Sequence, residues 1–332
     1  MHYLITGGAG FIGSNYVRHL LATVPDCRVR VLDKLTYAGN PANLQDVCRD
    51  ERFEFVQGDI CDPAAVTAAF DGINIVIHFA AETHVDRSIH SAEAAVKTNF
   101  EGTFRLLEAA RERGLKLFVH VATDEVYGSA EGGQRFDEES PLNPRNPYSA
   151  SKAGADRLAY SYFITYQLPV VITRPTNTYG PYQYPEKLIP LFVCRALNDE
   201  PLPVYGSGQQ QRDWLHVDDH CRAVDVLLSS GVPGQAYNVV GGNERVNMEV
   251  VRLILDELGK PESLIQHVED RPGHDIRYAL DDRKLKALGW SPQVEWEQGM
   301  RATIRWFAGH REWLEESVSR GREFMEQWYK NR

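Results

Sequence analysis

Short apolar runs alternate with helical patterns through the first half of the chain. The runs are HYLIT, CRVRVLD, FEFVQGD, NIVIHFA, LKLFVHVA and LPVVITR, and the last of them ends at residue 174. Continuous runs of this kind, rich in Val and Ile and separated by helices, are typical of parallel strands buried on both faces. The pattern therefore predicts an α/β fold with a doubly wound parallel sheet.

The alternation ends after Arg174. TNTYGPYQYPEKLIP and PLPVYGSGQQQRDWLHVDDH are dense in Pro, Gly, Tyr and Gln, a composition more typical of a pocket than of a sheet. We expect one domain over 1–174 and a smaller, mixed substrate-binding lobe over 175–332, with a strand near 236–240 (QAYNVVG) able to return to the first sheet. From about residue 297, aromatic and charged residues recur at helical spacing, which predicts a terminal helix packed on the surface.

Composition narrows the classes of function. The 332 residues carry a formal net charge of −10, which argues against coating nucleic acid or anionic lipid. No apolar run approaches the roughly eighteen residues of a membrane span, and the chain begins MHYLITGG, already a strand, so no signal peptide is expected. The five cysteines form no CxxC pair, which suits a reducing compartment. We expect a cytoplasmic protein.

A glycine-rich turn follows the first predicted strand and opens a helix. In TGGAGFIG, the glycines Gly7, Gly10 and Gly13 permit a tight turn and close approach of backbone N–H groups to a pyrophosphate, although alone they could be only a strand-to-helix turn. The next strand ends in Asp33, twenty residues after Gly13, where a carboxylate can accept hydrogen bonds from a ribose. This favours a Rossmann-type site for NAD over NADP, with Lys34 as a contrary sign.

Two further strand ends suit the same cofactor. In GDI, Asp59 stands where an adenine edge could lie, but it could equally cap the helix that begins DPAAV. HFAAETHV supplies small residues that let backbone approach the diphosphate and nicotinamide half. Both strand ends therefore fit the same cofactor, with the two interpretations of Asp59 left open.

YSASK opens a helix, with Pro147 as its start signal. The i, i+4 spacing puts Tyr148 and Lys152 on one helical face, where the ammonium should lower the pKa of the phenol and make it a base near neutral pH. The pair is frequent by chance alone. With the glycine turn and a strand that ends in Thr123, it becomes specific for hydride-transfer chemistry.

HVATDEVYG places Asp124 and Glu125 side by side where an apolar run stops. Oxidation at one carbon requires neither of these carboxylates. Elimination of water beside a new ketone, however, needs one acid and one base, and two carboxyls held close and poorly solvated cannot both stay ionised cheaply. Helix capping or solvated loop carboxylates are the alternative.

Several stretches give the chain a family resemblance. The glycine turn, the strand-end Thr and YxxxK resemble the extended short-chain dehydrogenase/reductase family. AAETHVDRSI, TDEVYG, NPYSASK, YGPYQYPEKLIP, YGSGQQQRDWLHVDDH, YNVVGGNERVN and DRPGHDIRYALD resemble its nucleoside-diphosphate-glucose 4,6-dehydratases, most closely those acting on dTDP-glucose. The stretches extend to about residue 285, and the combination of TDE, YQYPEKLIP and RDW is highly specific.

The resemblance implies a catalytic cycle. Tyr148 takes the C4 hydroxyl proton as hydride passes to NAD, with Thr123 bonded to the same hydroxyl and Lys152 holding the ribose and the phenolate. Glu125 then removes the C5 proton, protonated Asp124 releases the C6 hydroxyl as water, and hydride returns to C6. The expected product is the 4-keto-6-deoxy sugar nucleotide.

The resemblance also implies two sets of contacts. The expected cofactor residues are Gly7, Gly10, Phe11, Ile12, Gly13, Asp33, Lys34, Thr36, Asp59, Ile60, Phe79, Ala80, Ala81, Thr83, Thr98, Tyr148, Lys152 and Thr178. The expected substrate residues are Thr83, Asn177, Lys187, Leu188, Pro203, Tyr205, Arg212, Asn247, Arg271 and His274. Arg212 and Arg271 also stand in Gly- and Pro-rich settings, where an arginine fork suits a diphosphate.

Two positions depart from the family pattern. Thr178 stands where asparagine is usual, which puts one cofactor contact in doubt. Ala122 replaces a common serine, and we expect only a packing consequence. His216 and His220 have i, i+4 spacing, but no third ligand suits a metal site, so no metal is expected, and His78, His84 and His90 are interpreted as structural.

The resemblance further implies a homodimer, paired through helices around 93–112 and 148–166. Two alternatives to a dehydratase remain open. One is a sugar-nucleotide epimerase or decarboxylase on the same scaffold, and the other is a catalytically silent NAD-binding regulator.

Overall fold

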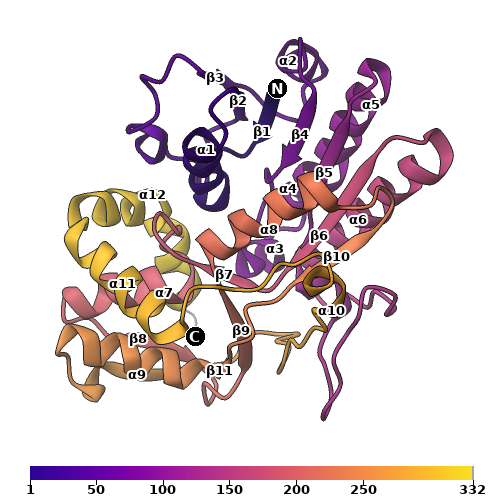
Figure 1. Ribbon diagram of the computed structural model, residues 1–332. Coiled ribbons are helices and arrows are strands. Elements are labelled where there is room, and N and C mark those ends of the chain that lie inside the picture. Colours follow the sequence, from indigo (N-terminus) through magenta and orange to yellow (C-terminus); the bar gives the residue numbers. More distant parts are fainter. Residues whose placement is uncertain (331–332) are drawn as a thin grey trace.

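The computed structural model describes residues 1–330, and its centre is a parallel sheet. Seven strands lie in the order β10-β6-β5-β4-β1-β2-β3, and every pairing between them is parallel (Figure 1). The strands are β1 (His2–Thr6), β2 (Arg28–Asp33), β3 (Phe53–Gln57), β4 (Ile75–His78), β5 (Leu117–Val121), β6 (Val170–Pro175) and β10 (Ala236–Val239). The first six coincide with the six predicted runs, which confirms the doubly wound sheet.

Helices cover both faces of this sheet and create two cores. One core joins α1 (Phe11–Thr23) and α8 (Val217–Ser230) to one face, and the other joins α5 (Thr103–Arg113) and α6 (Pro147–Tyr166) to the opposite face. All five residues of β5 are buried, as a strand covered on both sides requires. The short α2 (Pro63–Ala69) and η1 (Pro41–Leu44) lie between the sheet strands in sequence.

The remaining elements build a second, mixed unit beside the carboxyl ends of the strands. It contains a three-stranded sheet, β11-β9-β7, and a two-stranded sheet, β12-β8. The strands are β7 (Asn177–Tyr179), β8 (Leu202–Tyr205), β9 (Gln211–His216), β11 (Glu244–Val246) and β12 (Ile265–Val268). The helices are α7 (Leu188–Leu197), α9 (Asn247–Leu258), η4 (Glu262–Leu264), α11 (Trp296–Gly309) and α12 (Arg311–Lys330), whereas α10 (Arg283–Lys286) packs on β10 of the large sheet. A core of its own joins α7, α9, α11 and α12.

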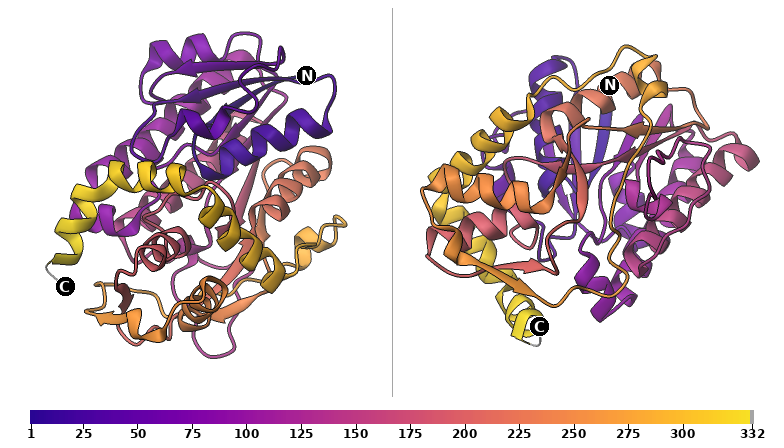
Figure 2. Two further views of the ribbon diagram at one scale, coloured as in Figure 1. Left: turned by 90° about the vertical axis from the view of Figure 1, so that its left-hand side faces the viewer. Right: turned by 90° about the horizontal axis from the view of Figure 1, so that it is seen from below.

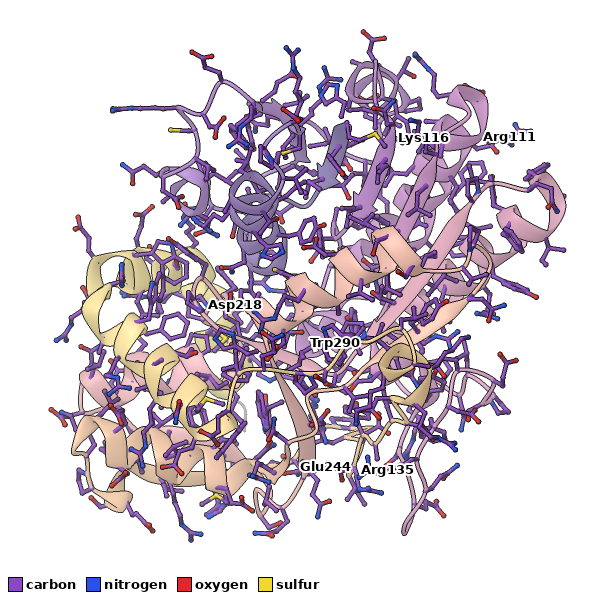
Figure 3. All side chains as sticks on the ribbon, viewed as in Figure 1. Arg111, Lys116, Arg135, Asp218, Glu244 and Trp290 are labelled. Carbon is purple, nitrogen blue, oxygen red and sulfur yellow. The ribbon has the colours of Figure 1, made fainter. Side chains whose placement is uncertain are left out.

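The two predicted ranges, 1–174 and 175–332, exchange segments in space. QAYNVVG contains β10, which pairs with β6, and α8 packs on α1, where the Tyr16 hydroxyl donates to Asp225 at 2.9 Å. Conversely, the excursion between β5 and α6 reaches the second unit through an ion pair of Arg135 with Glu244 of β11 (Figure 3). The division into an NAD-binding domain over 1–174 and a substrate-binding lobe over 175–332 stays a prediction.

Two helical predictions need finer boundaries. The helix expected around 93–112 is α4 (Glu93–Ala95), the π-helical η2 (Val96–Gly102) and α5, and Asn99 within η2 turns its side chain to the backbone of Glu82. The terminal helix expected from about 297 is two helices, α11 and α12, and residues 331–332 lie outside the described part. Among residues 1–330 we find no helix that is both long and apolar enough to cross a membrane.

Candidate active site

Two adjoining cavities lie at the carboxyl ends of the strands, and three residues line both: Glu125, Asn177 and Lys187. The first cavity runs along the glycine turn and the ends of β2, β4 and β5. All eighteen predicted cofactor residues and all five predicted catalytic residues line it. The second cavity lies among β8, β9, α3 (Val85–His90) and the 271–278 segment, and it is lined by every predicted substrate residue except Thr83. Thr83 lines the first cavity instead.

The glycine turn is too crowded for side chains at two of its positions. A Cβ on Gly13 would lie 2.3 Å from the carbonyl oxygen of Gly7, and a Cβ on Gly7, where φ is +70°, would lie 2.6 Å from the nitrogen of Ala80. A Cβ on Gly10 would meet only the Gly7 oxygen, at 3.2 Å. The glycines thus press α1 onto the strand ends and leave backbone as the cavity floor, which fits a pyrophosphate.

The end of β2 presents a buried carboxylate to the first cavity. Asp33 accepts hydrogen bonds from the backbone N–H of Ala9 at 2.9 Å and of Leu35 at 2.8 Å, so its orientation is fixed. Burial raises the pKa of Asp33. A fixed carboxylate at this place suits a ribose diol and repels a 2′-phosphate.

Lys34 is held away from an anion-binding role. Its ammonium pairs with Asp59 at 2.6 Å, and that hydrogen bond raises the pKa of Lys34. Asp59 also accepts from the N–H of Cys61 at 2.9 Å, whereas the cap of α2 is Asp62. The interpretation of Asp59 as a helix cap is therefore wrong, and Lys34 gives no support for a 2′-phosphate.

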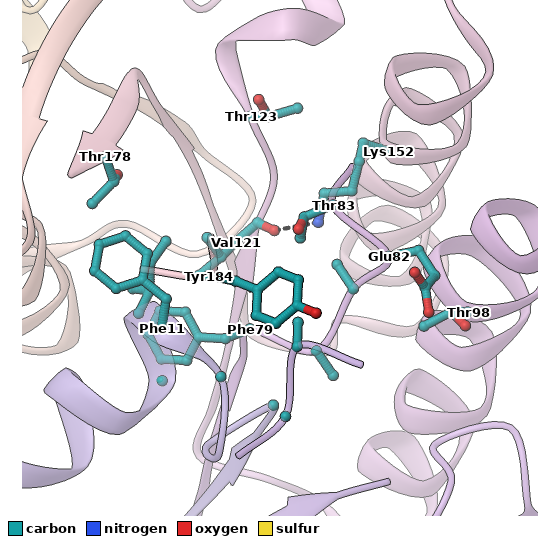
Figure 4. Close-up of a pocket in the computed structure, with 18 of the residues that line it drawn as sticks. Phe11, Phe79, Glu82, Thr83, Thr98, Val121, Thr123, Lys152, Thr178 and Tyr184 are labelled. Atoms are coloured by element: carbon teal, nitrogen blue, oxygen red, sulfur yellow. Dashed lines mark hydrogen bonds between the residues drawn. The ribbon is translucent and has the colours of Figure 1, made fainter. Parts of the chain in front are cut away.

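Tyr148 and Lys152 start α6, where Asn146 and Ser149 form a reciprocal N-terminal cap. Lys152 points at the end of β5 and donates to the carbonyl of Val121 at 2.5 Å (Figure 4). Burial lowers the pKa of Lys152 to about 8. Burial and then the charge of Glu125 raise the pKa of Tyr148, against which a hydrogen bond with Thr123 acts. The prediction that the ammonium of Lys152 lowers the pKa of the phenol is wrong for these residues, because burial is the largest cause of the shift and raises it.

Asp124 and Glu125 differ in environment although they are neighbours. Asp124 is only 3% exposed; one oxygen accepts from Thr123 at 3.1 Å, and the other has no partner among the described residues. Burial and then the charge of Glu125 raise the pKa of Asp124 well above its usual range. Glu125 accepts from Asn146 at 3.4 Å and lies 3.4 Å from the Tyr278 hydroxyl, whose single hydrogen has a shorter bond to Asp275 at 2.9 Å. Burial thus favours the protonated form of Asp124, beside the hydrogen-bonded carboxyl of Glu125.

The second cavity is lined by three cationic side chains, Lys187, Arg212 and Arg271, and by three acidic residues, Asp86, Glu125 and Glu186. Arg271 pairs with Asp86 at 3.2 Å, and Arg212 donates to the carbonyl of Asp275 at 2.9 Å with its guanidinium 4.3 Å from the Tyr278 ring centre. Lys187, His274 and these two arginines are the basic residues of its lining together with His84. Arginine forks in such a cluster suit a diphosphate in a protein of net charge −10.

The cavity edges explain the departures from the family pattern. Thr178 donates to the carbonyl of Thr176 at 3.3 Å and its hydroxyl lies 3.1 Å from Nδ1 of His220, so its polar group is directed at the protein. Ala122 is buried and joins the core under α5 and α6, and it also borders the first cavity. Thr83 offers its carbonyl to Lys187 at 2.6 Å.

The histidines have varied environments. No group of three His, Cys, Asp or Glu suited to a metal occurs within residues 1–330. His216 caps α8, and His78 is buried between Thr6 and Thr103 at 2.7 and 3.0 Å. His84, interpreted as structural, lines the second cavity and lies 3.0 Å from the carbonyl of Glu186.

Several lining residues were not predicted. They include the polar residues Glu82, Gln183 and Tyr184 in the first cavity and His84, Asp86, Glu186, Gln210 and Tyr278 in the second. Most of them lie inside AAETHVDRSI, YGPYQYPEKLIP and DRPGHDIRYALD, so the motifs already quoted held the signal. Glu186 and Asp86 bind side chains from other elements, which no spacing along the chain predicts.

Comparisons with known proteins agree with this geometry. Residues 4–303 match the family described as GDP-mannose 4,6 dehydratase. The chain is 50% identical to the dTDP-glucose 4,6-dehydratase of Streptomyces niveus over 95% of both chains. It is also 50% identical to DesIV, the dTDP-glucose 4,6-dehydratase of Streptomyces venezuelae, crystallised with NAD, with a TM-score of 0.94 over 96% of this chain and 100% of that one. A UDP-glucose 4-epimerase of Thermus thermophilus, solved with NAD, reaches 34% identity and a TM-score of 0.86 over 93% and 100%.

Proposed function

This chain belongs to the GDP-mannose 4,6-dehydratase family, and we propose that it converts dTDP-glucose to dTDP-4-keto-6-deoxyglucose by removing water. One observation carries the proposal: the two cavities meet at Glu125, beside the buried acid Asp124 and the phenol of Tyr148. A dehydration needs an acid, a base and an oxidisable carbon within one substrate length. This junction supplies the acid Asp124, the base Glu125 and, in Tyr148, a group that can act on the hydroxyl of the oxidisable carbon.

The first cavity fits NAD. Gly7, Gly10 and Gly13 would hold the pyrophosphate against backbone, Asp33 would accept the adenosine ribose hydroxyls, and Lys152 would reach the ribose of the nicotinamide half. When bound there, NAD supplies an acceptor for the hydride from C4 and a donor of hydride to C6. The overall conversion is a loss of water, so no external oxidant or reductant is consumed.

Tyr148 and Thr123 act on the C4 hydroxyl. Their side chains are hydrogen-bonded to each other, so a hydroxyl bound between them can pass its proton to Tyr148 in its phenolate form, which becomes the phenol, while Thr123 orients the hydroxyl. The raised pKa of Tyr148 makes the phenolate a strong base once formed, and the ammonium of Lys152 on the same helical face stabilises it. The product of this step is a C4 ketone, which acidifies the C5–H bond.

Glu125 and Asp124 perform the elimination. Glu125, exposed to both cavities, removes the C5 proton, and the electron pair forms the C5–C6 double bond as the C6–O bond breaks. Asp124, kept protonated by burial, gives its proton to the departing hydroxyl, which leaves as water. Protonation at C5 and hydride at C6 then complete the 6-deoxy product.

The second cavity would hold the nucleoside diphosphate. Arg212 and Arg271 face the diphosphate, with Lys187, Asn177, Asn247 and His274 around it, and Pro203, Tyr205 and Leu188 line the base. The buried side-chain oxygens of Asn177 and Asn247 have no partner among the described residues. Buried polar atoms of this kind are rarely left unpaired, which favours a polar ligand at this place.

We also propose that two copies pair through η2, α5 and α6. Val96, Phe100, Tyr160, Ile164 and Tyr166 are exposed large apolar residues on these helices, with Val96 and Ile164 about half exposed at 52% and 53%. An apolar surface on adjoining helices is typical of an oligomer contact. Cytoplasmic placement rests on cysteine usage and remains a prediction.

A direct assay tests the function. The purified protein is incubated with dTDP-glucose, without added oxidant, and the products are separated and identified by NMR. A 4-keto-6-deoxy nucleotide is expected. Formation of the C4 epimer alone would identify an epimerase, an outcome tested because the chain is similar to the Thermus thermophilus UDP-glucose 4-epimerase. Binding without turnover would identify a catalytically silent NAD-binding protein.

A further inference from the structure

The last helix, α12, lies beyond residues 4–303, the part of the chain that matches the family. In Figure 2, left, it crosses between the N-terminal sheet and the second unit. Its Phe324 ring lies 4.3 Å from the guanidinium of Arg87, which in turn binds Glu186 at the rim of the second cavity. A Cβ on Gly321 would lie 2.8 Å from oxygens of Glu186 and Tyr184, so the helix packs closely against this rim.

A chain of hydrogen bonds leads from α12 into the second cavity. The indole N–H of Trp328 donates to the Tyr205 hydroxyl at 2.7 Å, and that hydroxyl donates to Asp86 at 2.9 Å. The other oxygen of Asp86 pairs with Arg271 at 3.2 Å. Asp86 is 3% exposed, and although burial acts the other way, His84 and Arg271 lower its pKa, so it is a buried anion. Tyr205 and Arg271 both line the cavity, whereas Trp328 contacts one of them from outside.

We propose that α12 is part of the nucleotide-binding site, with Trp328 and Asp86 as positioning residues for the nucleoside diphosphate. The inference rests on the proposed function. The Tyr205 hydroxyl has a single hydrogen, which it gives to Asp86 while it accepts from Trp328. Its orientation is therefore set by protein, and its ring is presented to the base.

Asp86 likewise fixes the orientation of Arg271, the residue that faces the diphosphate. Its ion pair takes one N–H of the Arg271 guanidinium, which has five, and fixes the plane of the fork before a diphosphate arrives. A preorganised fork loses less entropy on binding than a mobile one. The relay therefore acts on affinity for the nucleotide, not on the chemistry at C4 to C6.

Trp328→Phe tests the relay, because it keeps the ring and removes the N–H donor. We expect the Kd for dTDP, measured by calorimetry, and the KM for dTDP-glucose to rise about fivefold with kcat unchanged, the size of one ordinary hydrogen bond. Asp86→Asn should raise both by about tenfold or more. In a Tyr205→Phe background, Trp328→Phe should add nothing, since its acceptor is gone.

Trp313→Phe is the matched control on the same helix. Its indole N–H donates to Asn43 at 2.8 Å, far along α12 from Trp328, so the substitution loosens the helix by a similar amount without touching the relay. We expect an unchanged Kd for dTDP. Gly321→Ala, which forces α12 away from Glu186, provides a second route and should weaken dTDP binding even if Trp328→Phe fails to fold.

Three outcomes would overturn the inference: an unchanged Kd in folded Trp328→Phe, an equal loss in Trp313→Phe, or a fall in kcat at constant KM. Failure of the proposed function is a separate result. If the wild-type protein does not dehydrate dTDP-glucose, the function is wrong. If it does, and Trp328→Phe binds dTDP as the wild type does, only the role of α12 is wrong.

Discussion

The two cavities fix their polar groups in different ways. On the cofactor side, Asp33 is held by backbone N–H groups and Lys152 by a backbone carbonyl, all at strand ends or the turns after them. On the substrate side, Arg271 is held by Asp86, 185 residues away in sequence. The cofactor-side groups are thus held by main-chain atoms at strand ends, whereas Arg271 on the substrate side is held by a side chain from a remote segment.

The difference predicts how substitutions act. A change at the cofactor side should alter the chemistry and leave nucleotide affinity intact, because its residues face the reacting carbons and the dinucleotide. A change at the substrate side should alter affinity and leave kcat nearly intact. Glu125, Asn177 and Lys187 line both cavities and are the places where this separation should fail.

Tyr148→Phe should give the largest effect. Loss of the phenol removes the base that starts the reaction, and kcat should fall about 10³- to 10⁴-fold, near the upper end for one positioned proton transfer. The Kd for dTDP should stay within twofold of wild type, because the phenol does not line the second cavity. A parallel loss of dTDP affinity would break the proposed separation of the two cavities.

Asp124→Asn and Glu125→Gln should separate the two halves of the elimination. Asp124→Asn cannot donate a proton to the leaving hydroxyl, so product formation should fall about 10²-fold while exchange of the C5 hydrogen with deuterated water persists. Glu125→Gln should suppress that exchange. NMR of recovered substrate measures both. Equal loss of C5 exchange in the two variants would contradict the assigned roles.

Arg271→Lys should produce a smaller effect, confined to affinity. Lysine keeps the charge but not the bidentate fork, so the KM for dTDP-glucose should rise about tenfold with kcat within twofold of wild type. Arg277→Lys is the control, since Arg277 pairs with Glu244 and does not line either cavity. Steady-state kinetics of both variants measure the contrast, and a dominant fall in kcat for Arg271→Lys would place this arginine in the chemistry instead.

The same contrast explains what the sequence could predict. Strand runs and strand-end residues predicted the sheet, the glycine turn and the cofactor side, because each has a signal within a few residues of the chain. The pairing of Lys34 with Asp59, the raised pKa of Tyr148 and the relay through Trp328 could not be predicted, since each depends on burial or on a partner from another element. The terminal helix was expected at the right place, but nothing in its spacing pointed to Tyr205.

The pH dependence of kcat provides the finest test of the cofactor side. Burial lowers the pKa of Lys152 to about 8, so raising the pH removes its charge near pH 8 instead of near its usual value of about 10.4. The phenolate of Tyr148 then loses its counter-charge, and kcat should fall to about half its plateau at pH 8 and decline further above it. Lys152→Arg, whose guanidinium stays charged above pH 12, should move this limb to higher pH in whatever activity remains. If the limb stays near pH 8 in that variant, Lys152 is not the titrating group. Lys187, whose pKa is also lowered by burial and which lines both cavities, would then be the group to change.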